Sequence, residues 1–423
     1  MRNDCVLSVA AAVFVVGVAV AEKPALKLGF MSDTHVTPKA SSADNVRGAF
    51  RVFRAQGADA VIHCGDLANF HYPAAYALYR QAKEDAYAGS GKLPEFYYVY
   101  ANHDALDPKS GKPMDLKRAF SDMRECLGES HPFLIERVFN GIPLIVFPES
   151  WTVAVKGKAE IEAKISAFET AHPGKPIVVV THEPEKGTVQ ASDRWGFHWG
   201  IWEKHPQVVL FTGHSHGSLR NPRCVWQGAF TAVDCGTLWV WNDFLGGKMD
   251  RKGKVAYEVY VAEFWSKKIV LRRFDVRDGS EIDPDSPWTM PLPFDPKTAP
   301  YAVGKCKDRE QPAAFPSGAQ VAVRVAPKDG KEVVMVEFPE TLSEDAVEKF
   351  RLVAECRDAT GRWTPVATNE MFSSYYVRPS DRTGKHEYTY KSGALPSAEK
   401  FRLSVTPVGF YGTGGKPIVS APD

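Results

Sequence analysis

Val61-Ile62-His63-Cys64-Gly65-Asp66-Leu67 is an apolar run that stops abruptly at a glycine and a carboxylate. The run is too short for a buried helix, and it predicts a covered strand that delivers Asp66 where the backbone leaves the sheet. An acid in that place either forms the turn or binds a ligand. The segment alone leaves both interpretations open, and the turn is the commoner of the two.

Four further strand-like segments end in residue types that bind metals. They are Phe30-Met31-Ser32-Asp33-Thr34-His35, Val99-Tyr100-Ala101-Asn102-His103-Asp104, Val178-Val179-Val180-Thr181-His182 and Leu210-Phe211-Thr212-Gly213-His214-Ser215-His216. Ligand sites in α/β sheets form at the carboxyl ends of the strands, so these strand ends can converge on one crevice. This convergence favours the ligand interpretation of Asp66.

The pattern of elements changes along the chain. Residues 25–66 are predicted to form a parallel β-α-β unit, whereas consecutive strands without helices follow His216 and include a hairpin around Trp265-Ser266-Lys267. We therefore expect an α/β fold that leans toward α+β, with a mixed sheet or two sheets packed face to face and helices outside.

A chain of 423 residues is too long for one typical core, so we expect two domains. The first is expected over residues 22–282. Residues 283–319 are rich in proline and lack periodicity, which is typical of a semi-rigid linker. From residue 320 onward apolar and polar residues alternate in short strands, which predicts an all-β sandwich over 320–423. The stretch 402–412 resembles the closing hairpin of a fibronectin type III module.

Residues 1–21 combine Arg2, an apolar stretch and the small-x-small pattern Ala19-Val20-Ala21. They predict a secretory signal peptide cleaved after Ala21, which gives a secreted or periplasmic protein without a membrane span in the mature chain. Asp4 and the single positive charge form a poor amino-terminal region, so an uncleaved membrane anchor is the alternative.

The overall composition is that of an ordinary soluble globular protein, with 44% hydrophobic and 24% charged residues. The net charge of +1 argues against a nucleic acid or an anionic membrane recognised by bulk charge. The six cysteines after the signal show no C-x-x-C pairing, which disfavours structural zinc and thioredoxin-like sites. Export would permit a disulfide, for which Cys224 with Cys235 is the pair to test.

The residue types at the strand ends suit two cations. Carboxylates can bridge metals, while imidazoles and amide oxygens complete the shells of Mn, Fe or Zn. Two-metal sites activate a water molecule and clamp an in-line displacement at phosphorus. Residues two apart in an extended segment point the same way, so Asp33 with His35, and His214 with His216, can act as pairs.

The five blocks, in this order and at these intervals, resemble the calcineurin-like metallophosphoesterase family over about residues 25–275. The resemblance implies a two-sheet β-sandwich flanked by helices, and a site for two divalent or trivalent metal ions. It assigns seven ligands: Asp33, His35, Asp66 and His216 for one metal, and the bridging Asp66 with Asn102, His182 and His214 for the other.

The same resemblance implies a hydrolase of phosphoric esters, in which a metal-bound hydroxide attacks phosphorus. His103 would stabilise the transition state or protonate the leaving oxygen. Asp104 either orients His103 or caps the following helix. The glycine common before the Asn-His pair is Ala101 here. Residues 67–71 offer no tyrosine where purple acid phosphatases supply their iron-binding phenolate, which disfavours a purple enzyme.

Two segments can contact the substrate. Residues 67–71 lie close to Asp66 in sequence, and their polar side chains could reach a phosphate. Residues 195–202 are dense in aromatic side chains and form either core or the wall of a pocket for a sugar, base or acyl group; Trp239 and Trp241 could line the same side. The candidates for substrate contact are Asn69, His71, Trp195 and His198.

Two alternatives to a monoesterase stay open. The enzyme could be a phosphodiesterase or nucleotide pyrophosphatase, a choice that depends on the loops 105–130 and 183–203. The fold could also be a catalytically silent, metal-stabilised binding or adhesion module. The C-terminal sandwich is expected to pack on the catalytic domain or to contact a polymer or surface.

Overall fold

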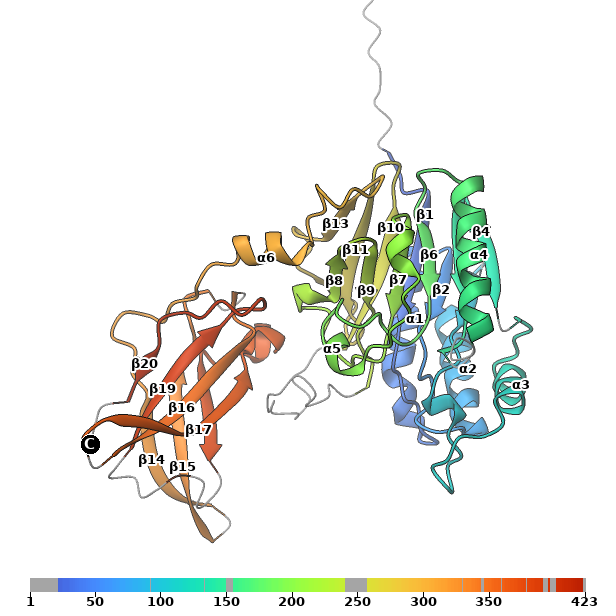
Figure 1. The fold of residues 1–423 in the computed structure, drawn as a ribbon. Coiled ribbons are helices and arrows are strands. Elements are labelled where there is room, and N and C mark those ends of the chain that lie inside the picture. The colour runs from blue at the N-terminus through green and yellow to red at the C-terminus, as the bar shows by residue number, and fades with distance from the viewer. Residues whose placement is uncertain are drawn as a thin grey trace, which may run out of the picture.

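The computed structural model describes residues 22–420, apart from residues 92, 133, 150–154, 240–256, 329, 344–345, 359, 378, 391–394 and 396–400. An α/β region is followed by an all-β region at the carboxyl end (Figure 1). The expected signal peptide and Trp241 lie outside the described residues. Among the described helices, none is long and apolar enough to cross a membrane.

The first sheet of the α/β region has seven strands in the order β12-β11-β10-β1-β2-β3, with β13 paired to β11. β1 and β2, and β2 and β3, run parallel, which confirms the β-α-β unit. β10 and β11 form the expected hairpin. The strands are β1 (Leu26–Met31), β2 (Ala60–His63), β3 (Glu95–Tyr98), β10 (Glu258–Phe264), β11 (Lys268–Asp275), β12 (Glu281–Ile282) and β13 (Trp288–Pro291).

The second sheet has six strands in the order β4-β5-β6-β7-β9-β8. Its inner face packs against the first sheet through one apolar cluster, in which the rings of Phe30 and Phe211 stack with centroids 4.0 Å apart. Two sheets packed face to face are therefore confirmed. The strands are β4 (Ile135–Phe139), β5 (Ile142–Val146), β6 (Ile177–Val180), β7 (Val208–Thr212), β8 (Val225–Gln227) and β9 (Thr231–Asp234).

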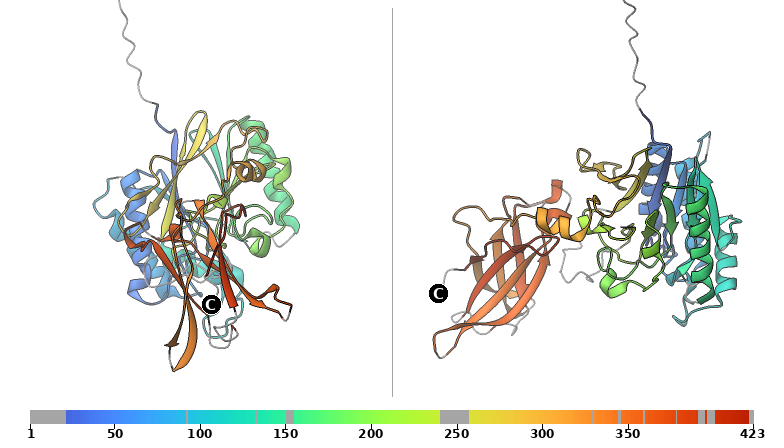
Figure 2. Two further views of the ribbon diagram at one scale, coloured as in Figure 1. Left: turned by 90° about the vertical axis from the view of Figure 1, so that its left-hand side faces the viewer. Right: turned by 45° about the horizontal axis from the view of Figure 1, so that its top comes forward.

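Helices cover both outer faces of this sandwich (Figure 2, left). On the first sheet lie α1 (Asp44–Gln56), α2 (Pro73–Tyr87) and α3 (Leu116–Leu127), which bury aromatic and aliphatic side chains against it. On the second lies α4 (Val155–Ala171), whose Ile161 and Ile165 are buried in the core beneath it. Short helices are η1 (Ala40–Ala43), η2 (His103–Ala105), α5 (Ser192–Trp195), η4 (Trp202–Lys204) and η5 (Pro222–Cys224).

The proline-rich segment 283–319 is only partly a linker. Within it, β13 pairs with β11 and extends the first sheet past the boundary expected at residue 282. The prolines of this segment argued against a strand in the sequence. An edge strand nevertheless tolerates proline, because one side of it makes no ladder hydrogen bonds. The helix α6 (Val303–Arg309) follows before the all-β region begins.

The carboxyl-terminal region is all β, as predicted. β14 (Ala322–Lys328), β15 (Lys331–Pro339) and β18 (Lys385–Tyr390) form one antiparallel sheet. β16 (Lys349–Arg357), β17 (Trp363–Phe372), β19 (Phe401–Val408) and β20 (Ile418–Val419) form the other, in the order β17-β16-β19-β20. Alternating side chains of both sheets share one core. The short helices η8 (Ser374–Tyr376) and η9 (Pro379–Asp381) lie between β17 and β18.

The cysteine pair suggested by the sequence is not joined. All six described cysteines are free thiols. The Sγ atom of Cys224 lies 3.1 Å from the carbonyl oxygen of Ser218, whereas the Sγ atom of Cys235 lies 3.5 Å from that of Cys64. Cys235 thus faces a partner from the opposite sheet, which no sequence spacing indicates.

Candidate metal centre

The seven side chains predicted as metal ligands all follow strands that end at one edge of the sandwich. The first sheet supplies four of them and the second supplies three. Asp33 and His35 follow β1, Asp66 follows β2, Asn102 follows β3, His182 follows β6, and His214 and His216 follow β7.

Two groups of these side chains bring ligand atoms within 4.8 Å of one another. One group is Asp33, His35, Asp66 and His216, and the other is Asp66, His182 and His214. Asp66 belongs to both groups, which is the arrangement that a bridging carboxylate requires. Asn102 lies beside them, because the amide of the next residue donates to Asp66 Oδ1 at 3.0 Å.

The donor atoms face one another across a buried space that suits cations. His35 Nε2 lies 3.0 Å from His216 Nε2, and His214 Nδ1 lies 3.1 Å from His182 Nε2. Among the described residues, Asp33 Oδ1, His35 Nδ1 and Asn102 Oδ1 are buried without a hydrogen-bond partner. Buried polar atoms are rarely left without a partner. The residues therefore fit two metal ions.

Electrostatics favour ionised carboxylates at Asp33 and Asp66 and a neutral imidazole at His214, which are the forms that bind metals. At His182, burial lowers the pKa, but Asp66 and Asp33 raise it well above the usual value, so a cation bound there would replace a proton. Burial opposes the charge of Asp33, but His216 and His182 hold the pKa of its carboxyl well below the usual range. Burial also opposes the charge of Asp66, and there the imidazoles again lower the pKa. Burial and the neighbouring His182 lower the pKa of His214 to about 4. Ionised carboxylates and a neutral imidazole are what a cation needs.

Hydrogen bonds behind the donors fix which atom of each faces the centre. His182 Nδ1 donates to the carbonyl oxygen of Cys64 at 2.8 Å, which leaves Nε2 toward the centre, 3.3 Å from Asp66 Oδ2. Asp33 Oδ2 accepts from the backbone amide of His214 at 2.9 Å, which leaves Oδ1 toward the centre, 3.0 Å from His216 Nε2. Such outer hydrogen bonds set the orientation and basicity of ligands.

The backbone at the centre is unusual, because five of the predicted ligands adopt positive φ. The angles are 49° for Asp33, 41° for His35, 54° for Asp66, 65° for His214 and 51° for His216. Residues other than glycine rarely occupy this region, and each such residue costs about 1–3 kcal/mol. Strain of this kind persists where surrounding structure over-determines it, and it turns these side chains inward at the strand ends.

His103 lies beside the two groups, with its ring centroid 4.6 Å from that of His35. Its Nδ1 lies 3.0 Å from the carbonyl oxygen of Asn69, which orients the ring and leaves Nε2 available. Asp104 does not provide this orientation. Its buried carboxylate accepts from the backbone amides of Leu67 and Ala68 at 3.3 and 2.9 Å, and so shapes the loop after β2.

The side chains predicted to touch the substrate are divided. Asn69 supports His103 through its backbone carbonyl oxygen, and the ring of Trp195 lies 6.3 Å from that of His214. His71 is buried, with Nδ1 3.0 Å from the carbonyl oxygen of Asp104, so it supports a loop. His198 is exposed and its Nδ1 lies 3.0 Å from Glu185, so the structure does not bring it to the other candidates.

Three further residues border the centre. Trp239, already suspected, places its ring 4.5 Å from that of His35. Glu149 follows β5 and accepts from the backbone amide of Asn102 at 3.1 Å, so the strand-end rule could have found it. The ring of Phe70 lies 6.4 Å from that of His103, and no feature of the sequence indicates this.

Residues 26–218 match the calcineurin-like phosphoesterase family. They form a calcineurin-like phosphoesterase domain. With the two ligand groups, this makes the protein a metal-dependent phosphoester hydrolase with a site for two divalent metal ions. The match covers all five blocks and ends two residues past the last, the Gly-His-Ser-His segment. No curated protein matches the chain in sequence.

Among solved structures, the chain is similar to a dimetal phosphatase from Danio rerio and to a purple acid phosphatase from yellow lupin (Lupinus luteus) seeds. The first shares 10% identity with a TM-score of 0.43, over 59% of this chain and 95% of that chain. The second shares 12% identity with a TM-score of 0.42, over 63% of this chain and 53% of that chain.

Proposed function

We propose that the protein is an exported enzyme that hydrolyses phosphoric esters at this centre, with the seven predicted side chains as ligands of two metal ions and His103 as the general acid. The observation that carries the proposal is the pair of ligand groups that share Asp66. When bound, two divalent ions polarise the phosphoryl oxygens and lower the pKa of a water molecule.

The chain's own residues account for the rest of the reaction. Asp66 and Asp33 carry the negative charge that holds the cations in place. The Asn69 carbonyl fixes the Nδ1 proton of His103, so Nε2 is the atom that gives a proton to the departing alcohol oxygen. The rings of Trp195 and Trp239 border the centre and support a substrate whose alcohol carries a ring.

The test compares His103→Ala with wild type on the full-length protein, reconstituted with Mn, Fe or Zn. Hydrolysis of mono(aryl), bis(aryl) and alkyl phosphates and metal content are measured on the same samples. We expect a loss in kcat of roughly 10²–10⁴ on the alkyl ester, whose poor leaving group needs the proton, at unchanged metal content. The loss on activated aryl esters should be smaller.

A matched control is His172→Ala, which changes a half-buried histidine directly after α4. Unchanged hydrolysis of the alkyl ester by His103→Ala would remove the assigned acid. Absence of metal-dependent hydrolysis across mono-, di- and pyrophosphate substrates would favour the binding-module alternative. A higher kcat/KM on bis(aryl) than on mono(aryl) phosphate would identify a diesterase.

Two parts of the proposal concern the ends of the chain. Export is supported by the pattern of residues 1–21 and is tested by the mass of the mature protein, which should begin at Glu22. The fibronectin type III-like assignment is supported by the division of seven antiparallel strands into sheets of three and four. Contact of this sandwich with a polymer or surface is tested by cosedimentation of the full-length protein with insoluble polysaccharides.

A further inference from the structure

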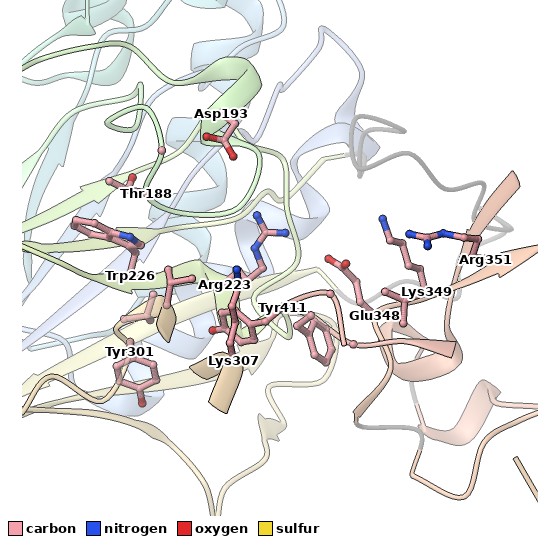
Figure 3. A pocket seen from close by; sticks show the side chains of 17 residues that line it. Thr188, Asp193, Arg223, Trp226, Tyr301, Lys307, Glu348, Lys349, Arg351 and Tyr411 are labelled. Carbon is pink, nitrogen blue, oxygen red and sulfur yellow. The ribbon is translucent and has the colours of Figure 1, made fainter. Parts of the chain in front are cut away.

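A second cavity, of about 400 Å³, lies between the phosphoesterase domain and the C-terminal sandwich (Figure 3). One side is formed by the loop at residues 187–193, by η5 with β8, and by α6. The other side is formed by the start of β16 and by the turn 408–412. This volume is in the range of sites for small ligands.

Basic side chains dominate the lining of this interdomain cavity. Among the described residues, four basic side chains face two acidic ones. Arg223, Lys307, Lys349 and Arg351 line it together with Asp193 and Glu348 (Figure 3). Burial raises the pKa of Glu348, and the nearby charge of Arg223 opposes that rise. The cavity therefore favours an anion.

Arg223 is held by its backbone while its guanidinium is left available. Asn221 Oδ1 accepts from the amide of Arg223 at 2.9 Å, and the amide of Gln190 donates to the carbonyl of Arg223 at 3.0 Å. Within the described part of the chain, the Arg223 guanidinium and the Lys307 ammonium make no hydrogen bond or ion pair. Lys349 and Arg351, in contrast, both pair with Glu370, at 2.7 and 3.4 Å.

Hydrogen bonds between the two domains hold the cavity in shape. Asn221 Nδ2 donates to Glu348 Oε1 at 3.2 Å and to the hydroxyl of Tyr376 at 3.1 Å, so the residue that positions Arg223 is tied to the sandwich. Next to α6, the carboxylate of Glu310 accepts from the amides of Tyr411 and Thr413 at 2.8 and 2.9 Å, which fixes the opposite wall.

We propose that this cavity is a second ligand site, separate from the metal centre, which binds a tetrahedral oxyanion group through Arg223 and Lys307. A guanidinium donates two parallel hydrogen bonds to such a group, and an ammonium adds a point charge. The rings of Trp226 and Tyr411 in the wall provide contact for the organic part of the ligand (Figure 3). The oxyanion belongs to a phosphate or a sulfate ester. The site uses none of the predicted metal ligands, so it stands or falls apart from the hydrolase proposal.

The test is hydrogen exchange of the full-length, metal-loaded protein in inorganic phosphate, in sulfate, and in sodium chloride at matched ionic strength. In phosphate we expect the amides of residues 408–412 to exchange at least threefold more slowly than in chloride. Equal slowing by sulfate supports a site for both kinds of ester, and no slowing by sulfate supports phosphate esters. Because inorganic phosphate is not turned over, the readout does not depend on catalysis.

Variants separate this site from general charge effects. Arg223→Gln and, on the exposed face of α6, Lys307→Gln should each abolish the slowing. The control Arg324→Gln removes an exposed cation that pairs with Glu387 on another face of the sandwich, and it should keep the slowing. Protection confined to the metal-centre segments overturns the proposal. Protection that persists in both Arg223→Gln and Lys307→Gln, or that is lost equally in Arg324→Gln, also overturns it.

Discussion

Gly65→Ala should weaken metal binding without changing any metal ligand. Gly65 has φ +107°, and a Cβ atom added there would lie 2.4 Å from Nδ1 and 2.7 Å from Cγ of His182. The imidazole would have to move, and its 2.8 Å hydrogen bond to the carbonyl of Cys64 would break. The Cβ atom of Ala101, 2.8 Å away on the other side, blocks an easy escape of the new methyl group.

Three effects set the size of the loss in stability. The positive φ costs about 1–2 kcal/mol with alanine. The steric overlap adds about 1–3 kcal/mol, and the lost hydrogen bond adds about 1 kcal/mol. We therefore expect a fall of about 3–6 kcal/mol in the free energy of unfolding. Disturbing the hydrogen bond behind a ligating histidine should lower metal affinity by about 10–100-fold.

Gly89→Ala is the matched control. Gly89 also has a positive φ, +72°, but nothing lies within 4 Å of an added Cβ atom. This variant should lose only about 1–2 kcal/mol and keep its metal affinity. Denaturant unfolding and competition of each protein with a chelator for Mn or Zn measure both quantities. Metal affinity of Gly65→Ala within twofold of that of Gly89→Ala would refute the role given to His182. If Gly65→Ala does not fold, His182→Gln tests the same affinity.

Three further outcomes are expected. Diamide should join Cys64 to Cys235, whose Sγ atoms lie 3.5 Å apart, as seen by mass spectrometry of unreduced peptides. Burial alone would raise the pKa of Glu340, but its hydrogen bond with His386 lowers it to about 2. This pair should therefore contribute up to ~3 kcal/mol above pH 4.5, lost as the pH falls toward 2, in urea unfolding against pH. Trp239→Ala, which removes a ring 4.5 Å from His35, should lower kcat/KM on aryl phosphates by about tenfold.

Each of these has a comparison within the chain. Cys224, which the sequence suggested as the partner of Cys235, should keep its free thiol when Cys64 and Cys235 are joined. Glu337→Gln, which removes an exposed partner of Lys385, should leave the pH dependence of unfolding unchanged, whereas Glu340→Gln should flatten it. Trp265→Ala, in the hairpin turn far from the centre, should keep full activity. If a control shows the same change as the residue it is compared with, the effect is due to general destabilisation and not to the contact named.

The sequence was sufficient to predict the ligand cluster because parallel strands constrain it strongly. Parallel strands end at a common edge, so Asp33 and Asp66 on the first sheet, and His182 and His214 on the second, had to gather at one edge of their own sheet once their segments were recognised as strands. The same argument predicted the face-to-face sheets, since strands buried on both faces need a covering layer.

Contacts that depend on the path of loops could not be predicted. The carboxyl group of Asp104 accepts hydrogen bonds from backbone amides of the loop after β2, because that loop bends back over η2. No local sequence pattern specifies this bend. His198 points to Glu185 and the solvent for the same reason. Cys64 meets Cys235 only because the two sheets stack in one particular register. The strand at 288–291 was hidden by prolines that an edge position tolerates.

The division of the ligands between the two sheets also has a mechanical consequence. Apolar side chains press the layers together without direction, and such contacts resist separation better than sliding. Cations bound by Asp33 and Asp66 of one sheet and by His182 and His214 of the other would cross-link the two sheets. Chelation would then loosen the sandwich against shear at its functional end while its apolar interior stays closed, so proteolytic nicking after metal removal should begin in the loops that leave that end.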